Sequence, residues 1–229
     1  DLFDAVTNQI VNVTTTDDDV PGFTVTETDG STEVDESGTT DTFTVVLTAQ
    51  PTSDVVLTLA SDDTGETTVS GSLTFTSANW DTPQTVTVTG ADDDIIDGTI
   101  TSNITITVDD ANSDDDFDNV ADQAVSVTTT DNDTAGFTVI ESGGSTGVNE
   151  DGETDSFTVV LNSEPISDVV IAISSDDTDE STVSPGSLTF TSANWDSPQT
   201  VIVTGADDDL ADGTQNSTVT IADRIIEHS

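Results

Sequence analysis

The sequence contains no cysteine, methionine or tyrosine, and it has a single basic residue among lysine and arginine, Arg224. Disulfide bonds are therefore excluded, and so are metal sites built from thiolates. Aromatic residues make up only 4% of the chain. No apolar stretch approaches the roughly 18–20 residues that a membrane-spanning helix needs. These absences argue against disulfide-stabilised folds, thiolate metal centres and membrane-spanning helices.

Catalysis is one of the functions that the composition argues against. The one histidine, His228, is the penultimate residue, and there is no cysteine to act as a nucleophile. A glycine-rich phosphate loop and a serine nucleophile motif are also missing. No pair of carboxylates stands out among the 47 acidic residues as a general acid and base. We therefore expect a protein that is not an enzyme.

What the chain has in abundance is negative charge, with a formal net charge of -46. Such a chain repels nucleic acid and anionic membranes, and neither is an expected partner. It also repels itself at low salt, so it needs a cation-rich solvent, bound divalent ions, or both. We expect an extracellular or cell-surface location. High acidity can also accompany disorder, but the 32% of hydrophobic residues lie in alternating runs, which favours a folded β protein.

The chain repeats itself once. Phe23 recurs as Phe137, and the phrase Leu73-Thr-Phe-Thr-Ser-Ala-Asn-Trp80 recurs as Leu188-Thr-Phe-Thr-Ser-Ala-Asn-Trp195. Such similarity indicates an array made by duplication. Within each unit, short Val-, Thr-, Phe- and Ile-rich runs alternate with a period of two and are separated by Gly, Pro, Ser and Asp. We predict an all-β protein: two tandem immunoglobulin-like antiparallel β-sandwiches of about seven short strands each, without significant helix.

Acidic residues gather at matching places in the two units. One cluster follows a middle strand, as 62–63 and 176–177, and a second follows the Thr-Val-Thr-Gly strand, as 92–97 and 207–212. A third is the triplet after the last strand, present as 17–19 and as 131–133. Crowded carboxylates remain ionised only when a cation neutralises them.

Oxygen ligands without histidine or cysteine favour Ca²⁺ over transition metals. Mg²⁺ fits less well, because it keeps more of its water and binds fewer carboxylates. The alternative is a solvated acidic surface adapted to salt, as in halophiles. That alternative explains the total charge but not the recurrence of the clusters at one end of each unit and in the linker. The loops do not have the EF-hand spacing, so the site would be assembled from several loops.

The unit also resembles a known family, the Calx-beta domain of sodium–calcium exchangers and large bacterial surface adhesins. The resemblance covers nearly the whole chain. Its marks in the first unit are Gly22-Phe23-Thr-Val, Val34-Asp35-Glu36-Ser37-Gly38, Phe43-Thr-Val-Val-Leu47, Gln84-Thr-Val-Thr-Val and Gly90-Ala-Asp-Asp-Asp, with Thr16-Asp-Asp-Asp as the trailing triplet.

The resemblance implies Ca²⁺ at the tip of each sandwich, with ligands from several loops. In the first unit the implied ligands are Glu36, Asp63, Asp92, Asp93, Asp97, Asp131, Asn132 and Asp133. In the second unit they are Glu150, Asp177, Asp207, Asp208 and Asp212. Asn132 departs from the family pattern because an amide carbonyl replaces a carboxylate. The second unit has no trailing triplet of its own.

The repeat is displaced relative to the chain, which predicts three parts. Residues 1–19 form an N-terminal donor strand with an acidic linker, 20–133 the first sandwich with its trailing linker, and 134–229 a second sandwich that lacks its last strand. The segment Gln9–Thr16 carries the missing strand pattern, with Ile10, Val11 and Val13 able to pack. We therefore expect head-to-tail polymerisation, in which each subunit donates this segment to the next.

In that arrangement the triplet Asp17, Asp18 and Asp19 would complete the Ca²⁺ site of the second unit of the neighbouring copy. The partner is then the protein itself, in an extracellular structural filament. The alternative is a calcium-rigidified spacer excised from a giant bacterial adhesin. A regulatory calcium sensor is a third interpretation, but extreme acidity and nearly identical repeats suit a rod better.

Overall fold

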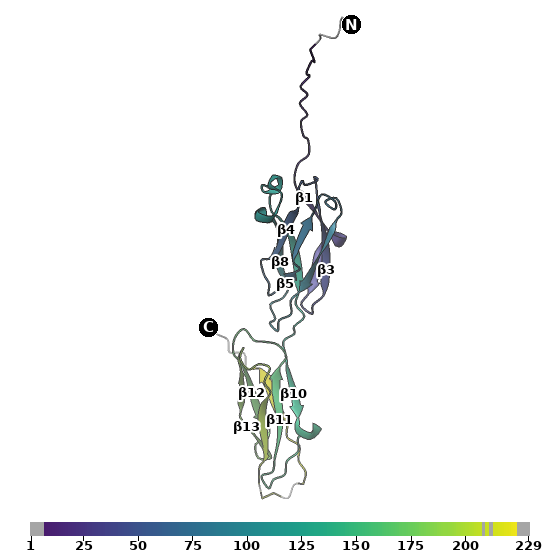
Figure 1. The fold of residues 1–229 in the computed structure, drawn as a ribbon. Coiled ribbons are helices and arrows are strands. Elements are labelled where there is room, and N and C mark those ends of the chain that lie inside the picture. The colour runs from purple at the N-terminus through teal and green to yellow at the C-terminus, as the bar shows by residue number, and fades with distance from the viewer. Residues whose placement is uncertain (1–6, 208, 211–212, 224–229) are drawn as a thin grey trace.

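The computed structural model describes residues 7–207, 209–210 and 213–223, and it consists of two β-sandwiches joined end to end. The prediction of an all-β chain is confirmed: the described helices are single 3₁₀ turns, such as η1 (Thr28–Gly30). Figure 1 shows the two sandwiches one after the other, with the N-terminal segment leaving the first at the end away from the second. No described helix is long and apolar enough to cross a membrane.

The first sandwich contains nine strands. They are β1 (Phe23–Glu27), β2 (Thr32–Asp35), β3 (Thr40–Leu47), β4 (Val55–Ser61), β5 (Thr67–Val69), β6 (Ser72–Phe75), β7 (Gln84–Gly90), β8 (Ile100–Val108) and β9 (Gln123–Thr130). Two further 3₁₀ turns, η2 (Asp110–Asn112) and η3 (Asp115–Phe117), lie between β8 and β9.

Two sheets face each other in this sandwich. One has the strand order β1-β3-β7-β5 and the other the order β2-β9-β8-β4-β6. All neighbours are antiparallel except β2 and β9, which run parallel with Thr32 opposite Val127. The core lies between the sheets, where alternate residues such as Phe43, Val45 and Ile106 are completely buried. The period-two pattern in the sequence therefore marks the inward faces.

The second sandwich contains seven described strands. They are β10 (Phe137–Glu141), β11 (Thr154–Leu161), β12 (Val169–Ser175), β13 (Ser181–Ser184), β14 (Ser187–Phe190), β15 (Gln199–Gly205) and β16 (Val219–Asp223), with one 3₁₀ turn, η4 (Ser142–Gly144), after β10. The sheet β10-β11-β15-β13 repeats the β1-β3-β7-β5 sheet of the first domain.

The other sheet of the second sandwich is smaller. Its order is β14-β12-β16, so that β16 is an edge strand, whereas its counterpart β8 is covered by β9. The described residues include no counterpart of β9 or of β2. Residues 146–149, which match the whole of β2, have no strand pairing. This follows from the first domain, where β2 pairs only with β9.

Candidate metal centre

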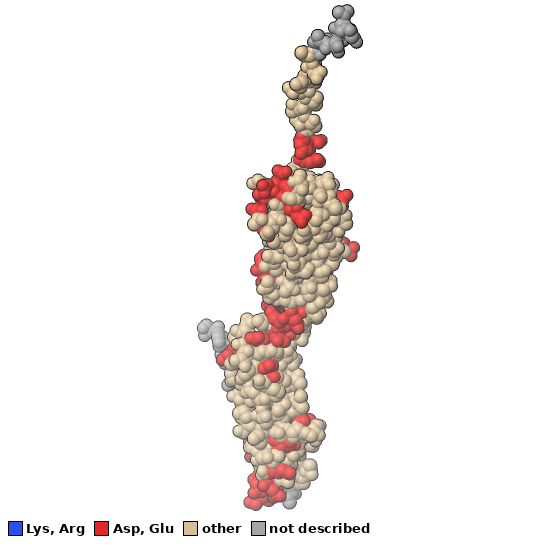
Figure 2. Space-filling view, viewed as in Figure 1, with Lys and Arg blue, Asp and Glu red and all other residues tan. Residues whose placement is uncertain are grey.

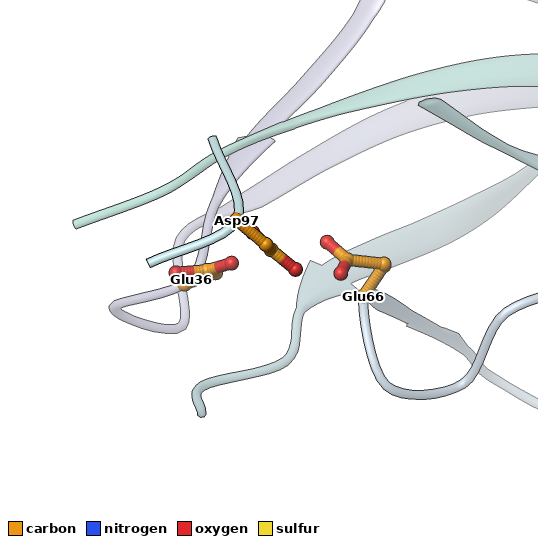
Figure 3. Close-up of side chains that lie close together, drawn as sticks. All are labelled: Glu36, Glu66 and Asp97. Carbon is orange, nitrogen blue, oxygen red and sulfur yellow. The ribbon is translucent and has the colours of Figure 1, made fainter. Parts of the chain in front are cut away.

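Three carboxylates from three loops meet at the end of the first sandwich that faces the second domain. Glu36 follows β2, Glu66 precedes β5, and Asp97 lies in the loop from β7 to β8. One oxygen from each can be chosen so that all three lie within 4.8 Å of one another. Figure 3 shows the side chains of Glu66 and Asp97 directed toward each other, with Glu36 beside them. The arrangement offers only oxygen ligands.

Backbone contacts hold these loops together. The N–H of Glu36 donates to the carbonyl of Thr130 at 3.2 Å, and the N–H of Ala91 donates to the carbonyl of Glu66 at 2.8 Å. Gly90, at the end of β7, lies so close to the backbone of Asp35 that a Cβ there would overlap the carbonyl group. Only glycine permits this approach without displacing the backbone. The approach places the acidic loop between β7 and β8 (residues 91–99) beside Glu36.

The linker to the second domain supplies a second carboxylate group. One oxygen each of Glu36, Asp131 and Asp133 also lie within 4.8 Å of one another. Asp131 accepts hydrogen bonds from the N–H of Gly98 at 2.8 Å and from the N–H of Asp133 at 2.7 Å. The N–H of Asn132 donates to Glu36 at 3.3 Å. Glu36 therefore belongs to both groups and connects the sandwich to its linker.

Burial makes this concentration of charge costly. Glu36 is 1% exposed and Glu66 is 6% exposed. Burial, reinforced by the charges of Asp97 and Glu36, raises the pKa of Glu66 to about 7. Burial also raises the pKa of Glu36 and that of Asp133. The negative charges repel one another in a region that water solvates poorly, so the protonated forms of these carboxyl groups are favoured.

The residues present fit a hard divalent cation. Oε2 of Glu66 and Oδ2 of Asp133 are buried and have no hydrogen-bond partner. Buried polar atoms in folded proteins are almost always satisfied, so these two point to a missing ligand. The one residue among lysine and arginine, Arg224, lies outside the described residues. The described part of the chain therefore offers no lysine or arginine to neutralise this cluster, and Ca²⁺ prefers such a set of carboxylate oxygens.

The remaining predicted ligands of the first unit surround these two groups without joining them. Asp92 accepts a hydrogen bond from the side-chain amide of Asn132 at 3.2 Å. Asp93 accepts one from the N–H of Ile95 at 2.7 Å, and its charge contributes to the raised pKa of Glu36. Asp63 is exposed and accepts a hydrogen bond from the N–H of Gly65 at 3.0 Å.

The predicted ligands of the second unit are not gathered in the same way. Glu150 is half-buried, while Asp177 and Asp207 are exposed. Asp208 and Asp212 lie outside the described residues. The triplet Asp17, Asp18 and Asp19 is exposed on the N-terminal segment. Within the described part of the chain, clusters of three carboxylates this close occur only in the first unit.

Glu66 is the ligand candidate that the sequence reasoning missed. It stands alone between Gly65 and Thr67, whereas the reasoning followed runs of acidic residues. The repeat held a usable signal, because Glu180 occupies the matching position before β13. Its burial, however, depends on the packing of three loops and is visible only in three dimensions.

The acidic loop of the first domain also contacts the second domain. The N–H of Glu164 donates to the carbonyl of Asp94 at 2.6 Å, and Ile95 forms a parallel bridge with Glu164. Figure 2 shows Asp and Glu side chains gathered at this junction and at the outer ends of the two sandwiches. The candidate centre therefore lies where the two domains meet.

Comparisons with known proteins give similarity at the level of structure only. No protein-family model matches the chain, and no curated protein sequence matches it. Similar solved structures include CBD12 from CALX1.2, at 17% identity and a TM-score of 0.35, covering 90% of this chain and 82% of that one. Domains 4–9 of the surface layer protein SbsC match at 19% identity and a TM-score of 0.31, covering 87% of this chain and 28% of that one. The E. coli chaperone DraB matches at 8% identity and a TM-score of 0.36, covering 82% of this chain and 87% of that one.

Proposed function

We propose that this protein is an extracellular structural subunit that binds Ca²⁺ at domain junctions and assembles head to tail by strand donation. One observation carries the proposal. The second sandwich has an open groove where β9 lies in the first, and the exposed N-terminal segment closely matches the sequence of β9.

The groove follows the path that β9 takes in the first domain. A cavity of about 300 Å³ is lined by residues of β10, β11, β15 and β16, together with Thr146 and Val148. The counterparts of these two residues, Thr32 and Val34, are 1% and 4% exposed in the first domain. Both become partly exposed in the second domain. The apolar interior of the second sandwich is thus partly uncovered along its β16 edge.

The same loss of burial appears on β16 itself. Ile104 and Ile106 of β8 are completely buried beneath the sheet that β9 completes. Their counterparts, Val219 and Ile221, are partly exposed. β16 also begins later than β8, since the matching residues 215–218 lie outside the strand. An unpaired strand edge of this kind is a template for pairing with another chain.

The N-terminal segment fits this template in register. Residues 9–16 read QIVNVTTT, and β9 reads QAVSVTTT. In β9 the inward residues Val125, Val127 and Thr129 are 2%, 0% and 0% exposed. The matching side chains are Val11, Val13 and Thr15, and the two valines are 83% and 82% exposed in the single copy.

This register refines the sequence-based expectation for Ile10. Its counterpart Ala124 is exposed on the outer face of the first domain, so that Ile10 would face outward after donation. The polar contact at the start of the strand would also be reproduced. Gln123 donates to the carbonyl of Phe23 at 2.7 Å, and Gln9 matches Gln123 as Phe137 matches Phe23.

The donor segment belongs in another copy because it cannot reach its own groove. Figure 1 shows it extending from the first domain on the side opposite to the second domain. The groove of the second domain is then filled by the next subunit, and the contact repeats without closing. Strand addition of this kind supplies both main-chain hydrogen bonds and side-chain pockets.

Donation would also complete the calcium site of the second domain. In the first domain the triplet at 131–133 follows β9 directly and meets Glu36. The triplet at 17–19 follows the donor segment at the same spacing, which carries it to Glu150 of the next copy. Each junction along the filament would then be held by Ca²⁺, both within subunits and between them. Millimolar extracellular Ca²⁺ matches modules with moderate affinity.

A longer polypeptide is the alternative arrangement. If the repeats continue beyond residue 229, the groove is filled within one chain, as in a calcium-rigidified adhesin spacer. Mass spectrometry of the native protein distinguishes the two, because only the filament subunit begins and ends near Asp1 and Ser229.

The proposed function is tested by removing the donor segment. Deletion of residues 1–16 should leave both sandwiches folded in Ca²⁺, with unchanged circular dichroism, and should abolish the head-to-tail polymers of the full chain in sedimentation velocity and electron microscopy. Polymers of normal length from the shortened chain would contradict strand donation.

A further inference from the structure

A second apolar cavity lies at the junction end of the second domain and is separate from the strand groove. It has a volume of about 460 Å³, within the roughly 300–1,000 Å³ of natural binding pockets. Its apolar wall comes from residues of β10, β11, β12 and the loop before β12: Phe137, Leu161, Pro165, Ile166, Val169 and Ile171. Ile166 is 86% exposed, more than any other large aliphatic side chain in the described part of the second domain.

In the first domain the equivalent space is filled by an aromatic ring. Phe117, in η3, is 2% exposed and belongs to the same buried cluster as Phe23, Leu47 and Val55. Phe23 and Val55 are 5% and 0% exposed. Their counterparts in the second domain, Phe137 and Val169, are only partly buried. The described residues of the second domain include no counterpart of the Phe117 ring.

A capped loop holds Phe117 in place. The carboxylate of Asp114 accepts hydrogen bonds from the N–H and the hydroxyl of Thr52, at 2.7 and 2.8 Å, and from the N–H of Ser53 at 2.8 Å. The counterparts of Thr52 and Ser53 are Ile166 and Ser167, which line the cavity of the second domain. The cavity thus corresponds to the site where the segment before β9 docks.

The chain contains one further copy of that segment, at its N-terminus. Phe3 stands six residues before Gln9, as Phe117 stands six residues before Gln123 (9 − 3 and 123 − 117). Val6 likewise matches Val120, which packs against the core of the first domain. Phe3 and Val6 lie outside the described residues, so the match rests on their positions in the sequence.

We infer that the cavity bounded by Phe137, Ile166 and Val169 receives the Phe3 ring of the next copy as an anchor for strand donation. The inference rests on the proposed function and adds the residue that sets the strength of the contact. Ile96, from the acidic loop of the first domain, also lines the cavity. The anchor site is therefore shared by both domains of the receiving copy, and it is lined by a loop that also carries Asp97.

The test compares two neighbouring substitutions in the full chain. Phe3→Ala removes the ring, whereas Leu2→Ala removes a similar apolar side chain whose counterpart, Asp116, is exposed. Burial of a phenylalanine predicts head-to-tail association that is about 10- to 100-fold weaker for Phe3→Ala. Leu2→Ala should associate like the unaltered chain in sedimentation velocity with Ca²⁺.

A cross-link tests the location independently of affinity, because the chain has no cysteine of its own. The double variant Phe3→Cys, Ile166→Cys should form a disulfide-linked ladder under mild oxidation. The control Phe3→Cys, Ile140→Cys should not, since Ile140 is exposed on β10 and does not line the cavity.

The outcomes separate this inference from the proposed function. If Phe3→Ala and Leu2→Ala associate equally well while deletion of residues 9–16 abolishes association, strand donation stands and the anchor is wrong. If deletion of residues 9–16 leaves association unchanged, or if the unaltered chain does not associate in Ca²⁺, both are wrong. A ladder from the Ile140→Cys control equal to that of the Ile166→Cys variant also overturns the anchor.

Discussion

The carboxylates of Glu36 and Glu66 converge with that of Asp97, within 4.8 Å, in a sequence that contains one basic residue. Both glutamates are more than nine-tenths buried, and one oxygen of Glu66 has no hydrogen-bond partner. Such a site destabilises the fold when it is empty and ionised, and a bound divalent cation reverses that effect. Three predictions on metal and charge follow from this pair.

Replacing Glu66 by glutamine should have opposite effects with and without calcium. In chelator at a pH above about 7, where Glu66 is mostly ionised, Glu66→Gln removes a buried charge and should raise the free energy of unfolding of the first domain by on the order of 1 kcal/mol. In Ca²⁺, the same variant should lose most of the calcium-dependent increase in melting temperature, because a neutral amide replaces one of the charged carboxylate ligands. Thermal unfolding followed by circular dichroism measures both. Glu33→Gln, an exposed acid on β2, is the control and should change neither.

Stability without calcium should depend on pH in an unusual direction. The folded-state pKa of Glu66 is about 7, above its ordinary value of 4.5. Between these two values the folded state holds a proton that the unfolded state has lost, so that the free energy of unfolding falls as pH rises from about 4.5 to 7. Calcium binding in this window should release protons. Denaturant titrations in chelator measure how the free energy of unfolding changes with pH. If the unaltered chain and the Glu66→Gln variant show the same dependence, the raised pKa does not belong to Glu66.

Assembly should distinguish calcium from simple ionic strength. With a net charge of -46, subunits repel strongly in dilute salt, where the screening length is roughly 30 Å at 0.01 M. Sodium chloride screens this repulsion but does not coordinate Glu36 or Asp133, so it should restore assembly only in part. Light scattering across matched NaCl and CaCl₂ series provides the comparison. Complete recovery in NaCl alone would indicate a halophilic surface rather than a metal site.

The register of donation can be tested with two matched pairs of charges on the same segment. Val11→Asp with Val13→Asp places the charges on the face that matches the buried residues of β9, and should abolish association. Ile10→Asp with Asn12→Asp adds the same number of charges on the outward face, and should retain association in Ca²⁺. Both variants should fold normally, because this segment is exposed in the single copy. Equal loss in both would mean that charge alone, and not register, explains the effect.

Much of the architecture could be predicted from the sequence, because strand pleat and side-chain alternation share a period of two. Runs such as Phe43-Thr-Val45-Val-Leu47 mark their buried face directly. The acids at Glu36, Asp97 and Asp133 could be expected near one another from the repeat and the family resemblance, although metal binding by them stays a prediction. The displaced repeat also predicts that the second domain leaves β16 at the edge of its sheet, because the strand matching β9 is not in that unit.

Other features depended on packing that no local pattern encodes. Glu66 is an isolated acid, and it is buried where its loop meets those of Glu36 and Asp97. The outward direction proposed for Ile10 rests on the exposure of Ala124 in β9. The cavity at Ile166 likewise required both domains in place, because Ile96 of the first domain forms part of its wall.

Hydrogen exchange of the backbone amides in residues 9–16 tests strand donation most directly. In the single subunit, this segment extends away from both sandwiches, and its amides should exchange as fast as those of an unfolded peptide. In calcium-induced polymers, the account predicts strong protection of 9–16 together with new protection of β16 (Val219–Asp223), its predicted pairing partner. Polymers in which residues 9–16 still exchange as fast as in the single subunit would contradict the account.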